Sequence, residues 1–196
     1  MFNRTVLTPP GRVLWTADTH FGHAGAIAHS GRPFASADEM DRLMAEAWNA
    51  TVGANDTVIH LGDFAMGLKG EHLEKMFASL KGRKILVAGN HDRAATFALG
   101  WESIHERVTV VTSAHRIVCD HYPLRSWDRA YHGSLHFHGH VHGKFGGTSQ
   151  SCDLGVDVWG YRPVALPEIL ARLAATPTPP EEWIGNETAS EEGNDA

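Results

Sequence analysis

Five short motifs rich in histidine and aspartate lie in order along this 196-residue chain, each at the end of an apolar run. They are Asp18-Thr19-His20, Gly62-Asp63, Gly89-Asn90-His91-Asp92, His121 and Gly139-His140-Val141-His142. Carboxylate and amide oxygens and imidazole nitrogens are ligands for divalent metals, and this set is large enough to hold two ions. A metal pair can generate a nucleophilic hydroxide and neutralise phosphoryl oxygens, so the motifs favour hydrolysis of a phosphate ester.

The elements that must position the first three motifs alternate between strand and helix. Short apolar runs typical of buried strands stop directly before these motifs, at residues 13–17, 57–61 and 84–88. Apolar side chains recur at helical spacing between the strands, at residues 37–51, after a Ser36–Glu39 capping box, and at 70–81. This alternation predicts an α/β fold with parallel strand pairing in its first half.

The second half contains more strand than helix. Its pattern predicts strands at residues 107–111, 115–119, 134–138 and 154–158, and a last helix at 167–174. Two of these strands lead into His121 and His140. Because adjacent strands deliver their following loops to one crevice in open α/β sheets, we expect all five motifs to converge in space.

Spacing and residue type within the motifs suit a metal site. Asp18 and His20 are separated by one residue, as are His140 and His142, which puts both side chains of a pair on one side of an extended segment. The carboxylate of Asp63 can bridge two cations, which a neutral histidine cannot do. Glycine directly precedes three of the motif ligands, where it permits tight turns and close backbone approach.

Composition predicts one domain at residues 1–175 and an acidic, flexible tail at 176–196. The net charge is −6, but six of the 23 acidic residues follow Thr176, where there is no Lys or Arg, so the rest of the chain is formally neutral. Because no basic stripe is present, duplex nucleic acid is not an expected partner.

Targeting signals and cysteines bear on location. The sequence shows no secretory signal and no apolar stretch long enough to span a membrane. Cys119 and Cys152 lie far apart, and nothing in the pattern requires them to pair. We therefore expect a cytoplasmic protein with reduced thiols and no membrane partner.

The order D-x-H, G-D, G-N-H-D, H, G-H-x-H resembles the calcineurin-like metallophosphoesterase superfamily, over residues 12 to about 165. The surrounding segments 18–23, 32–34 and 121–127 resemble a compact bacterial and phage branch of small phosphoesterases. The resemblance implies a four-layer α/β/β/α sandwich of two mixed sheets. It also implies two divalent metals, with Mn favoured; Fe, Zn, Co or Ni also suit mixed nitrogen and oxygen ligands.

Carried over residue by residue, the family pattern implies a ligand set for each metal. The first metal would bind Asp18, His20 and His142, the second would bind Asn90, His121 and His140, and Asp63 would bridge the two. A hydroxide between the metals would attack phosphorus in line.

Two residues of the third motif are candidates for catalytic roles. The resemblance implies that His91 stabilises a phosphoryl oxygen or protonates the leaving alkoxide. Asp92 could hold the tautomer of His91, or it could cap a helix that starts there.

Four further residues are candidates for substrate binding. His23 could reach a substrate phosphate or lie in a surface loop. Arg32 and Arg125 could clamp phosphate bidentately, with a structural salt bridge as the alternative for each. Trp127 could stack on a base or lie in the core. His136 and His138 share a strand face with His140, and we expect them to be buried near the site rather than to bind metal.

The leading hypothesis is a dinuclear-metal phosphoesterase acting on a phosphodiester or phosphomonoester of a small soluble substrate, such as a nucleotide. The segment after Gly62-Asp63 lacks the additional Asp and Arg of the protein serine/threonine phosphatase branch, which argues against that class. A nuclease on single-stranded ends is one alternative, against which the neutral body argues. A non-catalytic, metal-bound scaffold for protein interaction is another alternative. Such a protein would be free to lose the ligands and His91, whereas this chain contains all of them.

Overall fold

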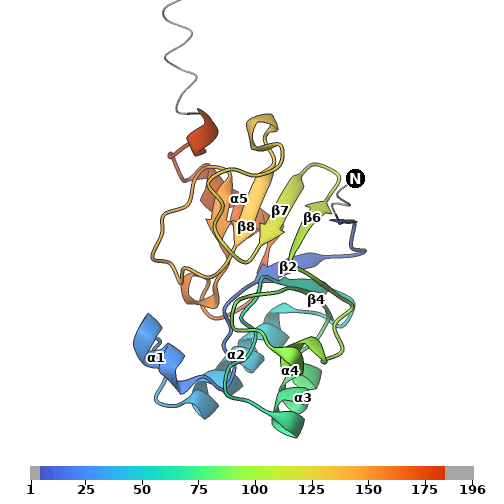
Figure 1. The fold of residues 1–196 in the computed structure, drawn as a ribbon, viewed down its shortest axis with the longest axis vertical. Helices are drawn as coiled ribbons and strands as arrows, with labels where there is room; N and C mark the ends of the chain where they lie inside the picture. The colour runs from blue at the N-terminus through green and yellow to red at the C-terminus, as the bar shows by residue number, and fades with distance from the viewer. Residues whose placement is uncertain (1–4, 184–196) are drawn as a thin grey trace, which may run out of the picture.

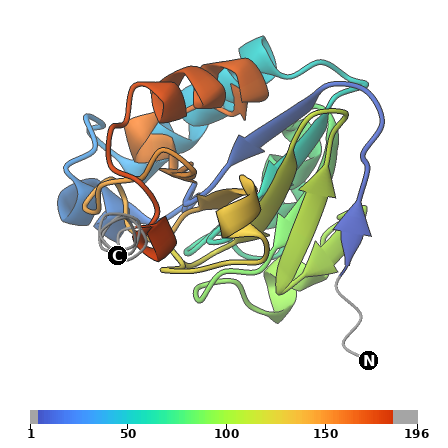
Figure 2. The same ribbon diagram turned by 90° about the horizontal axis from the view of Figure 1, so that it is seen from above.

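Two five-stranded mixed sheets face each other in the computed structural model, which describes residues 5–183 (Figures 1 and 2). The strand order of the first sheet is β10 (Val164–Ala165), β2 (Val13–Thr16), β3 (Thr57–His60), β4 (Arg83–Val87) and β5 (Ser103–His105). The order of the second is β1 (Val6–Leu7), β6 (Arg107–Val111), β7 (Arg116–Asp120), β8 (Leu135–His138) and β9 (Ser151–Asp153). The predicted α/β class with two mixed sheets is confirmed.

Helices connect the parallel strands of the first sheet. Strands β2 to β5 are all parallel, as predicted for the first half. Their connections contain α1 (Ala24–Ser30), α2 (Ala37–Thr51), α3 (Gly70–Ser79) and α4 (Ala94–Phe97). The predicted capping residue begins α2, because Ser36 accepts a hydrogen bond from the Glu39 backbone N–H at 3.1 Å.

The core lies in two layers because side chains alternate across the first sheet. Trp15 points toward the second sheet, where its ring meets Phe137 edge-on at 5.4 Å between centroids. Its neighbour Leu14 points outward and packs with Met40 and Trp48 of α2. Helix α5 (Leu166–Ala174) adds buried apolar side chains to the layer between the sheets. Both cysteines are buried and free.

The outer face of the second sheet has a thin cover. Trp127 and Ala130 pack on Val118 of β7, and the segment that carries them contains one short 3-10 turn, η1 (Ala130–His132). His136 of β8 lies beneath this segment and is completely buried. Its Nδ1–H donates to the Val118 carbonyl at 3.0 Å, and its Nε2 accepts from the Leu124 N–H at 3.0 Å.

One predicted strand is wrong. Residues 154–158 do not pair as a strand; β9 ends at Asp153, and Val156–Val158 form the 3-10 turn η2. The Asp153 carboxylate accepts hydrogen bonds from the N–H groups of Gly143 and Gly155, both at 2.7 Å, which bends the chain away from the sheet. Burial of Leu154 and Val156 produces the apolar pattern without strand pairing.

The described part of the predicted tail lies against the body. The Ser149 N–H donates to the Thr178 carbonyl at 2.7 Å, and the 3-10 turn η3 (Glu181–Trp183) follows. Residues 184–196 lie outside the described part of the chain. Among the helices at residues 5–183, none has the length and apolar character that crossing a bilayer requires.

Burial of His136 predicts a loss of stability in acid. Burial lowers the pKa of His136 to about 4, so the unfolded chain binds a proton there at pH values where the folded chain does not. The free energy of unfolding should therefore fall as pH decreases from about 6.5 to about 4. In metal-free protein, His136→Gln should reduce this fall by about 1–3 kcal/mol. Urea unfolding at a series of pH values measures it, and equal slopes in both proteins would contradict the assignment.

Candidate metal centre

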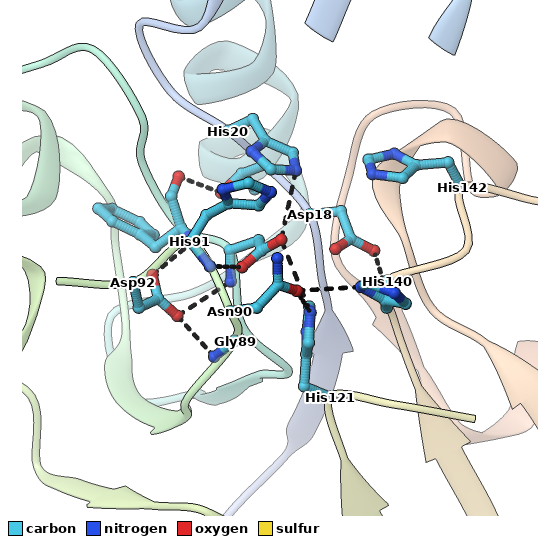
Figure 3. A network of polar contacts seen from close by, with 12 residues as sticks. Asp18, His20, Gly89, Asn90, His91, Asp92, His121, His140 and His142 are labelled. Carbon is cyan, nitrogen blue, oxygen red and sulfur yellow. Dashed lines mark hydrogen bonds and ion pairs between the residues drawn. The ribbon is translucent and has the colours of Figure 1, made fainter. Parts of the chain in front are cut away.

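The five motifs converge where the carboxyl edges of the two sheets meet, as expected from their positions after strands (Figure 3). Backbone hydrogen bonds hold neighbouring strand ends together. The Asp18 N–H donates to the Gly62 carbonyl, and the Gly139 N–H donates to the His121 carbonyl, both at 3.0 Å. The His140 N–H donates to Asp18 Oδ2 at 2.8 Å and links the two sheets.

Glycines at the strand ends allow this close approach. A Cβ atom on Gly62 would lie 2.6 Å from the Gly89 Cα and 2.6 Å from His121 Nδ1. A Cβ on Gly89 would lie 2.3 Å from Asp63 Oδ1, and one on Gly139 would lie 2.8 Å from Asp18 Oδ2. These distances are too short for any side chain, so glycine at each position sets the spacing of the ligands.

Two groups of candidate ligands result. Asp18, His20 and His142 form one group, and Asp63, His121 and His140 form the other; within each group one ligand atom per residue lies within 4.8 Å of the others. Asn90 joins the second group through its side-chain oxygen, which lies 2.8 Å from His121 Nε2 and 3.0 Å from His140 Nδ1.

Asp63 lies between the groups. Its Oδ2 atom is 3.6 Å from His20 Nε2 in the first group and 3.6 Å from His121 Nε2 in the second. Its Oδ1 atom accepts a hydrogen bond from the backbone N–H of His91 at 2.8 Å. This carboxylate is therefore placed to contact a cation in either group.

The ligand chemistry fits divalent cations. Burial lowers the pKa of His20 to about 2, so its imidazole is neutral and keeps a lone pair for a metal. Burial, followed by the nearby charges of Asp153 and Asp63, raises the pKa of Asp18. Among residues 5–183, Asp18 Oδ1 and His20 Nδ1 are buried without a hydrogen-bond partner. Buried, unpaired oxygen and nitrogen atoms beside several carboxylates indicate a place for positive charge.

The ligand backbone is held in an unusual conformation. Five candidate ligands have positive φ angles: Asp18 (56°), His20 (50°), Asp63 (59°), His140 (71°) and His142 (50°). The left-handed region is unfavourable for residues other than glycine, and such strain concentrates at functional sites. The hydrogen bonds and packing of the surrounding strand ends therefore stabilise backbone conformations that these residues would not adopt by local preference alone.

A cavity of about 360 Å³ opens over the centre. His91 and His23 line it together with His20, and the ring centroids of both lie close to that of His20, at 5.5 and 5.4 Å. Both predicted residues thus face the open space beside the candidate ligands.

Asp92 does not cap a helix. Helix α4 begins two residues later, and its N-cap position is occupied by Arg93 without a side-chain cap. The buried Asp92 carboxylate instead accepts three backbone N–H bonds, from Gly89 (2.9 Å), Asp63 (2.9 Å) and Phe64 (3.0 Å). Since both oxygens are engaged by backbone, Asp92 ties the second motif to the third rather than holding the His91 ring.

Arg32 is buried below the site and makes the salt bridge that the sequence left as an alternative. Its guanidinium pairs with Asp157 at 2.8 and 3.0 Å and also donates to the carbonyls of Asp18 (2.6 Å) and Thr19 (2.9 Å). Asp157 in turn lies 2.7 Å from His142 Nδ1. The sequence alone does not identify Asp157 as a site residue. The only indication in the sequence is that an acidic residue occurs within an apolar run.

The other two candidates for substrate binding lie outside the cavity. The exposed Arg125 pairs with Glu181 at 2.6 Å. Trp127 is buried, and its indole N–H donates to the Ser134 carbonyl at 3.0 Å, so it belongs to the core. His138 is also buried, and its Nδ1–H donates to the Gly139 carbonyl at 3.1 Å.

The contact between Asp157 and His142 predicts a graded effect on metal affinity. Removing a carboxylate that orients a metal-binding histidine costs about 10- to 100-fold in affinity, so Asp157→Ala should weaken binding by that factor. Asp157→Asn should cost less, because the amide oxygen still accepts from His142. Equilibrium dialysis with Mn²⁺ measures both, with the exposed Asp38→Ala as a control. Unchanged affinity in folded Asp157→Ala would show that His142 needs no such support.

Two known proteins resemble this chain over most of its length. The chain is 27% identical to an uncharacterized protein of Methanocaldococcus jannaschii, over 83% of this chain and 90% of that one. It is 27% identical to the Gene 66 protein of Mycobacterium phage D29, over 75% of this chain and 88% of that one.

A crystal structure of a protein of unknown function from Aquifex aeolicus shares the fold, with a TM-score of 0.64 and 22% identity over 81% of this chain and 97% of that one. The family model of the calcineurin-like phosphoesterases matches residues 11–140, which include four of the five motifs and the first histidine of the fifth. The chain therefore belongs to the calcineurin-like phosphoesterase family.

Proposed function

We propose that this protein hydrolyses a phosphodiester or phosphomonoester of a small soluble substrate at a centre of two divalent metals. The observation that carries the proposal is the position of Asp63, whose Oδ2 atom lies 3.6 Å from a histidine of each ligand group. A carboxylate shared in this way suits two adjacent cations better than one.

The residues of the chain would hold the metals in two sets. Asp18, His20 and His142 would form one set, Asn90, His121 and His140 would form the other, and Asp63 would serve both. When bound, two divalent cations supply a nucleophile from water near neutral pH and positive charge for the phosphoryl oxygens. Mn²⁺ is our proposed metal, since the donors mix oxygen with imidazole nitrogen.

His91 acts on the substrate side of the centre. Its backbone is fixed by the hydrogen bond to Asp63 Oδ1, while its ring lines the cavity. From there the imidazole can donate a proton to the leaving oxygen or a hydrogen bond to a phosphoryl oxygen. We place this activity in the cytoplasm, where the two buried, free cysteines remain reduced.

The proposal predicts metal-dependent hydrolysis that requires His91. Mn²⁺-loaded protein should cleave bis-p-nitrophenyl phosphate or p-nitrophenyl phosphate, and a chelator should abolish the activity. His91→Ala should lower kcat by about 10²–10⁴-fold because it removes a proton donor. Its metal content, measured by mass spectrometry of the metal, should stay at the wild-type value.

The matched control is His72→Ala, on the exposed side of α3. It should leave both activity and metal content unchanged. A protein that carries its metals but cleaves neither substrate with any of several divalent ions would instead fit the non-catalytic scaffold.

A further inference from the structure

The cavity over the metal centre extends beyond the candidate ligands. Its outer part is lined by His29 and Ser30 from the end of α1, and by Lys144 and Phe145 from the loop after β8. We propose, on the basis of the proposed function, that this outer part binds a second phosphoryl group and a planar aromatic group of the substrate. A nucleoside diphosphate represents this class of ligand.

The ammonium of Lys144 and the imidazole of His29 form the part that we assign to the second phosphoryl group. Lys144 Nζ lies 3.3 Å from His29 Nε2, although the two residues are 115 positions apart. Among residues 5–183, Lys144 makes no ion pair with a carboxylate. Asp63 is the one acidic residue among the described residues that line the cavity, and it belongs to the candidate ligands. An ammonium beside an imidazole, without a neighbouring carboxylate, attracts an anion.

Lys144 and His29 lie next to the candidate metal centre. Ser30 follows His29 directly, and its Oγ is 3.3 Å from Nδ1 of the candidate ligand His142. Lys144 follows the same ligand by two residues. His29 and Lys144 are therefore each close in sequence to a residue of the first ligand group or to one in contact with it. A phosphoryl group bound between them would lie next to one bound at the metals.

Phe145 offers the surface for the aromatic group. It is 63% exposed, the largest value among the exposed large apolar side chains of the described residues. Covering such a ring with a flat ligand removes apolar surface from water and permits stacking. Phe145 directly follows Lys144. We therefore place the three parts of the cavity in the order metal centre, second phosphoryl group and aromatic group of the ligand. The cavity volume of about 360 Å³ falls in the range of ligand pockets.

Three probes separate these parts by direct binding. Orthophosphate tests the metal centre, pyrophosphate adds the second phosphoryl group, and ADP adds the ring. Calorimetric titration into Mn²⁺-loaded protein, freed of excess metal, measures each affinity without requiring turnover. The variants are Lys144→Met and Phe145→Ala, with Lys69→Met and Phe97→Ala as matched controls on the exposed surface outside the cavity.

Wild-type protein should bind pyrophosphate more tightly than orthophosphate. Lys144→Met should weaken pyrophosphate about tenfold, the loss of one charged hydrogen bond, and orthophosphate by less than about twofold. Phe145→Ala should weaken ADP about tenfold and leave pyrophosphate unchanged. Neither control should alter any of the three affinities.

Equal weakening of orthophosphate and pyrophosphate by Lys144→Met, or no effect on either, would overturn the subsite. An equal response of ADP and pyrophosphate to Phe145→Ala would overturn the role of the ring. The expected binding pattern without hydrolysis of either nitrophenyl substrate would reject the proposed reaction and keep the subsite. Absence of binding by all three probes would reject both.

Discussion

The close approach of backbone at the carboxyl edges of the two sheets sets everything else in this site. Gly62 and Gly89 lie so close together that a Cβ atom on either would overlap atoms of the neighbouring strand end. Gly139 makes the corresponding approach between the second sheet and Asp18 of the first. Because these three positions carry no side chain, candidate ligands from segments more than 100 residues apart can approach closely enough to share one cluster.

That approach concentrates carboxylates and imidazoles at a largely buried position. Burial raises the pKa of Asp18 and lowers that of His20, so the unfavourable electrostatics of these grouped side chains and their suitability for cations have the same cause. The structure supports the cluster from below. Asp92 fastens two ligand loops through backbone N–H groups, and the Arg32–Asp157 pair fastens Asp18 and His142. We therefore expect binding of the proposed metals to be coupled to folding.

Much of this centre could be predicted from the sequence, because its ligands obey a local rule. Apolar runs of strand length are visible without the fold, and Asp18, Asp63 and Asn90 each follow one of them. The rule that sites form at the carboxyl ends of adjacent strands then brings the ligands together. The prediction of a strand at residues 154–158 is wrong for a physical reason. The apolar pattern shows that these residues are buried, but it does not show that the Asp153 side chain turns the backbone by accepting a hydrogen bond from it.

Residues whose role depends on distant partners could not be predicted in this way. Arg32 and Asp157 are 125 positions apart, and neither position shows that the pair is buried beneath the ligands. Lys144 and Phe145 lie in a glycine-rich loop without periodicity, where only the cavity shows what they face. The sequence thus indicates the candidate ligands that follow strands, whereas their supports and the proposed substrate surface depend on tertiary packing.

If Asp63 joins the two ligand groups into one centre, two bound ions should interact magnetically. Electron paramagnetic resonance of metal-free protein titrated with Mn²⁺ detects this interaction. We expect two ions per chain with a spectrum of exchange-coupled Mn²⁺ pairs, and loss of that coupling in Asp63→Ala. A single ion per chain, or two ions whose spectra are those of isolated Mn²⁺, would contradict it.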